Sequence, residues 1–206
     1  MPDRRGFTVI ELLVVVVILG VLFAILLPVL LRAKASARRA VCVTQLEQIA
    51  KATRMYADDY DRVIVPARTA VAGMGRGITW CVILQTYLKS DKILICPDDD
   101  NPLPTKDSVC LPHSYGINYA LAFNSLWGPA PFTTSIAHVQ RVSDIILFFD
   151  MKGSVAEMGS SYTAHRLGRV DFRHNEIGNF AYLDGHVKGL RKDAAGDMRA
   201  WDPFSG

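Results

Sequence analysis

The sequence predicts an α+β chain in which a long N-terminal helix precedes a small antiparallel sheet. Three observations support this fold class: an uncharged apolar run near the start, an amphipathic pattern that continues it, and alternating strand-like segments joined by an Asp-Gly turn. At 206 residues, the chain accommodates a membrane segment and one modest domain.

The first element is an apolar helix long enough to cross a membrane. Residues 12–31 are twenty residues without a charge, and a helix of that length spans roughly the 30 Å of a bilayer's hydrocarbon core. A buried core helix is disfavoured, because a helix that is apolar on every side suits lipid better. Pro28 lacks the amide hydrogen that its turn needs, so we expect a bend or a locally melted turn there.

Glu11 is the one acid inside this apolar region. A carboxylate in a membrane helix costs about 2.5–3.5 kcal/mol on insertion scales, so it normally needs a partner or a function. The residues before the helix are basic, with Arg4 and Arg5 in a six-residue leader.

The run Gly6-Phe7-Thr8-Val9-Ile10-Glu11-Leu12-Leu13, with its basic leader and the apolar helix that follows, resembles the processing site of type IV pilins and type II secretion pseudopilins. The resemblance implies that a prepilin peptidase cuts after Gly6 and that Phe7 is then N-methylated. It also implies that Glu11 neutralises the terminal amine of a neighbouring subunit when helices pack into a filament.

The resemblance further implies a pilin-like fold, with the long helix packed on the sheet, and a single-pass anchor in the bacterial inner membrane. We expect a leader at residues 1–6, a transmembrane and assembly helix at 7–31, an amphipathic continuation at 32–60 and an extracytoplasmic globular domain at 61–206. Counting positive charges does not settle the orientation, because long domains translocate largely regardless of charge.

Two other kinds of N-terminal segment compete with this interpretation. A secretory signal peptide also has a basic start, and Ala33-Lys34-Ala35 mimics its cleavage site, but its apolar core usually has only 7–15 residues and no acid. A plain anchor would carry a monomeric extracytoplasmic binding module. It explains the length of the helix but leaves Gly6, Phe7 and Glu11 as accidents.

Helical patterning continues beyond the apolar run to about Asp59. One stripe recurs at alternating spacings of four and three residues: Cys42, Leu46, Ile49, Thr53, Tyr56 and Tyr60. Glu47 and Lys51 lie on the opposite face in the favourable i, i+4 order. Separate helices with a break between residues 32 and 36 remain the alternative.

The remaining chain alternates short elements and loops. Residues 78–89 have the spacing of a short helix, and residues 114–120 and 145–149 read as strands. Residues 179–190 are the clearest hairpin signal, because Asp184-Gly185 favours the positive backbone angles of a type I′ turn.

The four cysteines, Cys42, Cys81, Cys96 and Cys110, would face an oxidising compartment if the domain is exported. They allow three complete pairings. We favour Cys96 with Cys110, because the two flank a Pro-rich loop whose closure costs little. Zinc is the alternative, since Cys110 and His113 have a two-residue ligand spacing.

A run of acids follows Cys96. Asp98 and Asp100 have oxygens that suit calcium, and the resemblance to pseudopilins, some of which carry calcium in surface loops, implies the same ion. The spacing does not match a helix-loop-helix calcium motif, so the alternative is a set of solvated side chains without a cofactor.

A second resemblance concerns the C-terminal half. His174, nine intervening residues and Asp184-Gly185 are similar to the H-X9-DG signature of one group of prepilin-type proteins, whose biochemical role is not implied by the likeness. One hypothesis brings His174, Asp150 and Asp184 together as metal ligands or as a hydrogen-bonded cluster. The alternative, which we favour because ligand spacing is lacking, is that Asp184 makes the turn and His174 caps a strand.

Composition and motifs argue against two other function classes. Acidic and basic residues are equal in number beyond residue 60, so no general nucleic-acid binding is expected. Hydrolytic residue types occur at Ser160, Ser161, His165, His174 and Asp184, but there is no Gly-x-Ser-x-Gly elbow, so no catalytic site is expected.

The sequence therefore predicts a structural filament subunit rather than an enzyme. Its expected partners are copies of itself, related minor subunits, the prepilin peptidase and the inner membrane. Its expected final location is a pilus or pseudopilus.

Overall fold

A computed structural model describes residues 8–69, 78–102, 111–122, 134–152, 169–196 and 200–201 of the chain. The chain divides into two compact units, Met1–Ala37 and Arg38–Gly206. A long helix and a four-stranded antiparallel sheet dominate the described residues, which confirms the expected α+β class.

Helix α1 runs from Val9 to Asp59, the end point that the amphipathic pattern predicts. All of these residues are helical, so the alternative of a break between residues 32 and 36 is wrong. The helix also continues through Pro28 without a melted turn. A bend at Pro28 stays a prediction.

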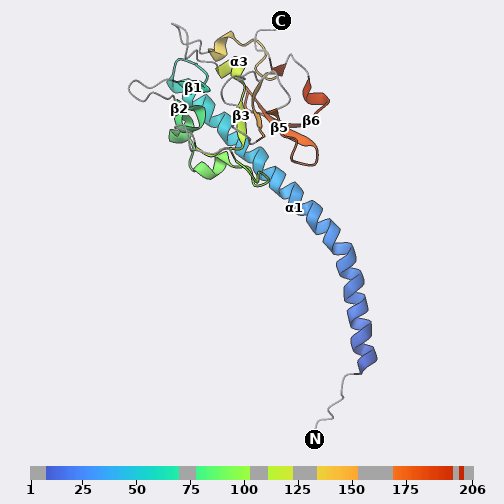
Figure 1. Cartoon of the computed structure of the whole chain (residues 1–206). Coiled ribbons are helices and arrows are strands. Elements are labelled where there is room, and N and C mark those ends of the chain that lie inside the picture. Colours follow the sequence, from blue (N-terminus) through green and yellow to red (C-terminus); the bar gives the residue numbers. More distant parts are fainter. Residues whose placement is uncertain are drawn as a thin grey trace. The chain divides into compact units, whose positions relative to one another are not determined.

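The main sheet has the order β3-β4-β5-β6, with every neighbouring pair antiparallel. Figure 1 shows β3, β5 and β6 in the same unit as the C-terminal part of α1. Their bounds are β3 Tyr115–Ile117, β4 Ile146–Asp150, β5 Ile177–Tyr182 and β6 Val187–Arg191. The strand expected at residues 145–149 and the hairpin expected at 179–190 are thus confirmed.

Short elements fill the space around the sheet. A two-stranded ribbon pairs β1 with β2, and the helical turns are α2, η1, η2, α3, η3 and η5. Their bounds are β1 Arg68–Thr69, β2 Ile78–Thr79, α2 Trp80–Ile83, η1 Leu84–Thr86, η2 Asp91–Leu94, α3 Tyr119–Ala122, η3 Ile136–His138 and η5 Ala194–Gly196.

Two expected elements are shorter than the sequence pattern indicates. The helix expected at residues 78–89 begins as strand β2 and ends in a 3-10 turn. The strand expected at residues 114–120 ends at Ile117, because the Asn118 side chain accepts a hydrogen bond from the Ala120 amide and starts α3. Asn118 also donates to the backbone carbonyls of Ile146 and Trp201, which fixes this change of direction inside the core.

The β5–β6 turn differs from the expected type I′. Among the turn residues only Gly185 has a positive φ, of 99°, and the Gly185 amide donates to the Tyr182 carbonyl at 2.9 Å. This is a three-residue loop ending in a left-handed glycine. The reason is tertiary: the Leu183 and Asp184 amides donate to the carbonyls of Ile145 and Val142, which pulls the loop towards the preceding strand.

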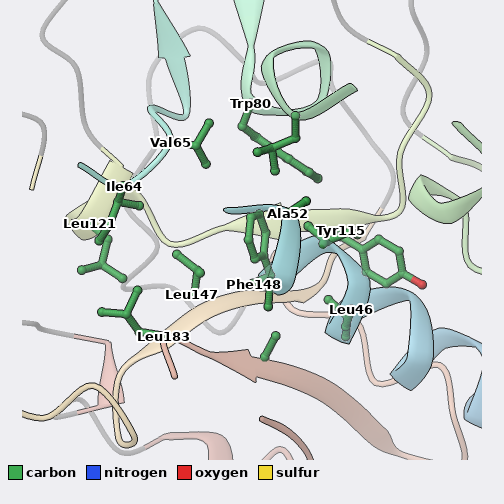
Figure 2. Packing of buried hydrophobic residues seen from close by; sticks show 14 of the residues in the cluster. Leu46, Ala52, Ile64, Val65, Trp80, Tyr115, Leu121, Leu147, Phe148 and Leu183 are labelled. Atoms are coloured by element: carbon green, nitrogen blue, oxygen red, sulfur yellow. The ribbon is translucent and has the colours of Figure 1, made fainter. Parts of the chain in front are cut away.

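The buried stripe of α1 packs against one face of the sheet. Cys42, Leu46 and Ile49 are fully buried in the same hydrophobic cluster as Tyr115 and Phe148. Figure 2 shows Leu46 and Ala52 of α1 close to Phe148. The predicted stripe is therefore the contact surface of the helix from Cys42 to Thr53, with Tyr56 half-buried, whereas Tyr60, beyond the end of the helix, is exposed.

The sheet carries a second hydrophobic cluster that includes Phe149, Phe180 and Trp201. A register shift between Ile146 and Phe148 sends Leu147 and Phe148 to the helix-side cluster, while Ile146 and Phe149 join the second cluster. Strand β4 is therefore buried throughout, which explains its unbroken apolar run.

Candidate functional site

The N-terminus of α1 is closed by a reciprocal pair of side chains, Thr8 and Glu11. The Thr8 amide and hydroxyl both donate to Oε2 of Glu11, at 2.9 and 2.7 Å, and the Glu11 amide donates to Thr8 Oγ1 at 3.4 Å. This is a capping box, which satisfies backbone donors that the first helical turn leaves unpaired. Glu11 therefore has a partner within its own chain.

The first part of α1 exposes apolar side chains around its whole circumference. Within the first unit, every large hydrophobic residue from Val9 to Leu31 is exposed. By length and composition, α1 qualifies as a membrane-spanning helix. Gly6 and Phe7, the expected processing residues, lie outside the described residues.

A disulfide links Cys42 of α1 to Cys96, with the two Cα atoms 5.4 Å apart and both side chains buried. The expected pairing of Cys96 with Cys110 is therefore wrong. Loop-closure entropy rises only slowly with loop length, so nearness in sequence is a weak guide, and the buried stripe of α1 brings Cys42 to Cys96 instead. Cys110 itself lies outside the described residues.

A buried polar cluster adjoins this disulfide. His174 Nδ1 is 3.0 Å from Oδ2 of Asp98, which assigns the proton to Nδ1 as the donor to that carboxylate. The other ring nitrogen, Nε2, is 3.5 Å from both Cys96 Sγ and Asp150 Oδ2. The sequence hypothesis thus places His174 beside Asp150 correctly, and the structure adds Asp98 and the cysteines.

Asp150 ends strand β4 with no exposed side-chain surface. Its Oδ2 accepts hydrogen bonds from the Asn179 amide at 2.8 Å and from Asn179 Nδ2 at 3.0 Å. Its Oδ1 accepts none from the part of the chain that the structure describes. A buried carboxylate oxygen without a donor is costly, so this atom needs an explanation.

Burial controls the protonation of the cluster. Burial raises the pKa of Asp150 to about 7, against the opposing effect of the Asn179 hydrogen bonds and the Arg173 charge. Burial also lowers the pKa of His174, although the Asp98 carboxylate acts in the opposite direction. At neutral pH His174 is therefore uncharged, and its contact with Asp150 is not an ion pair between full charges.

The acidic run after Cys96 makes ion pairs. Asp98 contacts Arg38 at 3.1 Å, and Asp99 contacts the buried Arg173 at 2.8 Å. Asp100 is exposed. Two of the three carboxylates thus face arginine side chains, and calcium at Asp98 and Asp100 stays a prediction.

Asp184 does not join His174 and Asp150, because it follows β5 whereas His174 precedes it. Its Oδ1 accepts a hydrogen bond from the His186 amide at 3.1 Å, and its carbonyl accepts one from Arg54 at 2.6 Å. The hypothesis that three residues converge is therefore wrong for Asp184, which shapes the turn as the favoured alternative holds. That alternative does not account for His174, which contacts Asp98 and Asp150.

The other sequence-based candidates are not assembled by the described residues. Cys110, the proposed zinc partner of His113, lies outside them, and so do Ser160, Ser161 and His165. The His113 ring contacts the Leu111 carbonyl at 2.8 Å and packs edge-on against Trp80.

Sequence reasoning missed several members of the buried cluster, chiefly Asn179, Arg173 and Asp99. Asn179 is fully buried in the middle of β5, where a polar residue in an apolar strand signals a specific hydrogen-bond partner. The position of Cys42 on the buried stripe of α1 was a second signal. The Thr8-x-x-Glu11 spacing was a third, because it matches a capping box.

Comparison with known proteins identifies the N-terminal segment. Residues 1–27 match the prokaryotic N-terminal methylation motif. The motif is typical of the prepilin-type signals of type IV pilins and pseudopilins, which confirms the resemblance seen at residues 6–13. The match covers the N-terminal segment alone, whose helix is long and apolar enough to cross a membrane.

Neither a curated protein nor a solved structure matches the chain. The H-X9-DG resemblance at His174 and Asp184 stays a prediction.

Proposed function

We propose that this chain is a structural subunit of a filament of the type IV pilus or type II secretion pseudopilus kind. The peptidase removes residues 1–6, Phe7 becomes the methylated N-terminus, and subunits assemble by lateral packing of α1. The observation that carries the proposal is a methylation motif that ends in an apolar helix with one carboxylate in its first turn. Proteins with this motif are structural subunits rather than enzymes.

The exposed surface of α1 supports assembly through the helix. The large apolar side chains from Val9 to Leu31 are all exposed in the described part of their unit, so lipid or neighbouring helices must cover them. Before assembly, lipid covers these side chains. In a filament, the same surface packs against copies of itself and related minor subunits.

The disulfide supports an extracytoplasmic position for the globular unit. Structural disulfides persist in oxidising compartments and are rare in the cytosol. Cys42 and Cys96 are buried within Arg38–Gly206, so their bond is part of the folded core of that unit. Export of this unit, with the leader remaining inside, accounts for the bond.

In this proposal Glu11 caps its own helix and also neutralises the terminal amine of a neighbouring subunit. A matched set of variants separates the two roles. Glu11→Gln keeps an oxygen that accepts the Thr8 hydrogen bonds but removes the negative charge. Thr8→Val removes the hydroxyl that bonds to Glu11 but keeps the charge. The readout is the fraction of the processed subunit found in sheared filaments rather than in the membrane of the native host.

We expect both variants to be cut after Gly6. Incorporation of Glu11→Gln should fall about tenfold or more, because loss of one partner of a buried ion pair costs about 3–5 kcal/mol. Thr8→Val should stay within about fivefold of wild type, since a capping contact contributes only about 1 kcal/mol. Normal assembly of Glu11→Gln would reduce Glu11 to a helix cap and overturn its role as the counterion of a neighbouring subunit's terminal amine.

A monomeric membrane-anchored binding module is the other outcome of this experiment. In that case the wild-type chain itself would stay in the membrane fraction and be absent from filaments. Crosslinking would then recover only single chains.

A further inference from the structure

We propose that Cys42, Cys96, His174 and Asp150 form a zinc(II) site in the reduced chain, so that disulfide formation and metal binding exclude each other. The inference rests on the buried cluster of the globular unit. It is independent of whether the chain assembles into filaments.

Three of the four proposed ligand atoms already lie close together. The two Sγ atoms and a ring nitrogen of His174 all lie within 4.8 Å of one another. Nε2 of His174 is 3.5 Å from Cys96 Sγ and 3.5 Å from Asp150 Oδ2. Ligand atoms around tetrahedral zinc are separated by ~3.3–3.8 Å, as follows from bond lengths of about 2.0–2.3 Å. Once the S–S bond opens, the cysteine side chains are free to rotate towards this spacing, and Asp150 approaches the group through its contact with Nε2.

His174 is oriented as a metal-bound histidine is. Its Nδ1–H donates to Asp98 Oδ2 at 3.0 Å, and Asp98 is held in turn by Arg38 at 3.1 Å. This leaves the lone pair of Nε2 facing the cysteines and Asp150. A carboxylate on the outer nitrogen is the usual means of fixing the tautomer and ring orientation of a zinc ligand.

Asp150 supplies an independent observation. Its Oδ1 is fully buried and accepts no hydrogen bond from the described residues, while its Oδ2 lies beside the unprotonated Nε2 of His174. A positive charge between these two electron-rich atoms stabilises their contact: a proton supplies it in the metal-free chain, and a metal ion can take the proton's place. The unpaired oxygen is explained if it turns towards, or shares, that ion.

The donor set selects the metal. Two thiolates and an imidazole favour zinc over calcium or magnesium, which take oxygen ligands. All four proposed ligands are at most 3% exposed. Four buried protein ligands make a closed site, which is typical of structural zinc.

Opening the Cys42–Cys96 bond requires a two-electron reductant from outside the protein. A phosphine or dithiol reductant donates two electrons, and with two protons these convert the Cys42–Cys96 bond into two thiols. Zinc then replaces one proton on each sulfur, so two protons are released per ion. An oxidant that removes two electrons restores the S–S bond and expels zinc.

The test uses the full chain in detergent under anaerobic conditions, with cobalt(II) as the optical probe and zinc(II) as its competitor. After reduction by a phosphine, wild type should bind one cobalt ion with the intense visible bands of a tetrahedral site and a thiolate charge-transfer band. Zinc should displace it. Cys42→Ser, which keeps only the Cys96 thiolate, should lose part of the charge-transfer intensity and bind at least about tenfold more weakly.

Cys81→Ser is the matched control for Cys42→Ser, since it removes a buried cysteine outside the proposed ligand set. It should bind cobalt as wild type does. Wild-type affinity in Cys42→Ser, or loss of binding in Cys81→Ser, would place the metal elsewhere and overturn the proposal. So would equal binding by the oxidised wild-type chain.

A second pair of variants tests Asp98 as a positioning residue. Asp98→Asn should weaken cobalt binding about 10–100-fold, which is the usual effect of losing an outer carboxylate. Asp100→Asn, at an exposed acid two residues away, should not change it. Equal affinities for the two variants would contradict the assigned orientation of His174.

The zinc site can also be tested if the reduced chain unfolds. If reduction alone abolishes the native circular dichroism, one equivalent of zinc has to restore it, because binding to such a site stabilises the fold. Failure of zinc to restore the signal, or to raise the melting temperature of a reduced chain that stays folded, overturns the proposal.

Discussion

The single carboxylate in the apolar helix illustrates how one residue serves the fold before it serves assembly. Glu11 accepts two hydrogen bonds from Thr8, so the helix start is stabilised within one chain. The cost of placing this acid near lipid is thus partly offset before a second subunit arrives. Charge and capping are separable, since glutamine keeps the acceptor and loses the charge.

Asp150 gives the clearest pH prediction for the oxidised, metal-free protein. Its pKa is about 7 when folded and 3.8 in the unfolded reference, so the native state holds its proton between these values. The stability that this group contributes is present below about pH 4 and is lost as the pH rises through 7. His174, whose folded pKa is lowered, has the opposite pH slope.

The difference between wild type and Asp150→Asn isolates the effect of this carboxyl. Asparagine imitates the protonated acid in shape, so the variant should gain in melting temperature relative to wild type as the pH rises from 4.5 to about 8. Thermal unfolding with a chelator present measures this. Asp100→Asn should follow the wild-type profile. A pH-independent difference between wild type and Asp150→Asn would show that Asp150 is ionised throughout.

The partners of His174 were not predictable from spacing. Asp98 and Asp150 lie 76 and 24 residues away in the sequence, and the sheet brings them together only after folding. The sequence pattern did identify both aspartates as candidates. What it could not supply was burial, which decides that they accept hydrogen bonds inside the domain rather than from water.

At the scale of elements, strong periodicity was sufficient for α1 and for the β5–β6 hairpin. The end of α1 at Asp59 and both strands of the hairpin match the sequence pattern. The turn between the strands did not follow local preference, because the Leu183 amide donates to the Ile145 carbonyl. Tertiary hydrogen bonds overrode the Asp-Gly preference for type I′.

Replacing the glycine of this turn, Gly185, should destabilise the protein. Gly185 has a φ of 99°, which side chains with a Cβ rarely adopt. Gly185→Ala should therefore lower the free energy of unfolding by about 1 kcal/mol or more, as urea denaturation of the oxidised chain would show. Gly185→Asn should lose less, because asparagine tolerates positive φ better. Equal stability of all three proteins would contradict the conformation of the loop.

The bond between α1 and Cys96 should contribute strongly to stability. It closes a loop with a sequence separation of 54, for which the chain-entropy relation gives about 4 kcal/mol. Cys42→Ser should lower the unfolding free energy by that order in chemical denaturation. Wild type under reducing conditions with a chelator should match it. A loss below about 1 kcal/mol would mean that the helix docks without the bond.

With Cys42 and Cys96 joined, one complete pairing of the four cysteines remains, between Cys81 and Cys110. Cys81 Sγ lies 3.9 Å from the carbonyl of Leu111, the residue next to Cys110 in the sequence. We therefore expect peptide mapping of the non-reduced protein to recover a Cys81–Cys110 linked peptide. Recovery of Cys81 as an alkylated thiol, under denaturing non-reducing conditions, would contradict this pairing.

At the scale of the whole molecule, the chain combines two units whose surfaces suit different surroundings. Met1–Ala37 exposes apolar residues that suit lipid or other helices, and Arg38–Gly206 buries its own core around the sheet and the disulfide. The proposed function rests on the first unit, because this unit contains the N-terminal methylation motif.

The most direct test is the mass of the mature N-terminus, taken from the membrane and from sheared filaments of the native host. The account predicts a chain that begins at methylated Phe7, while Gly6→Ala retains the six-residue leader. A wild-type chain that keeps residues 1–6, or that begins after Ala35, would contradict it.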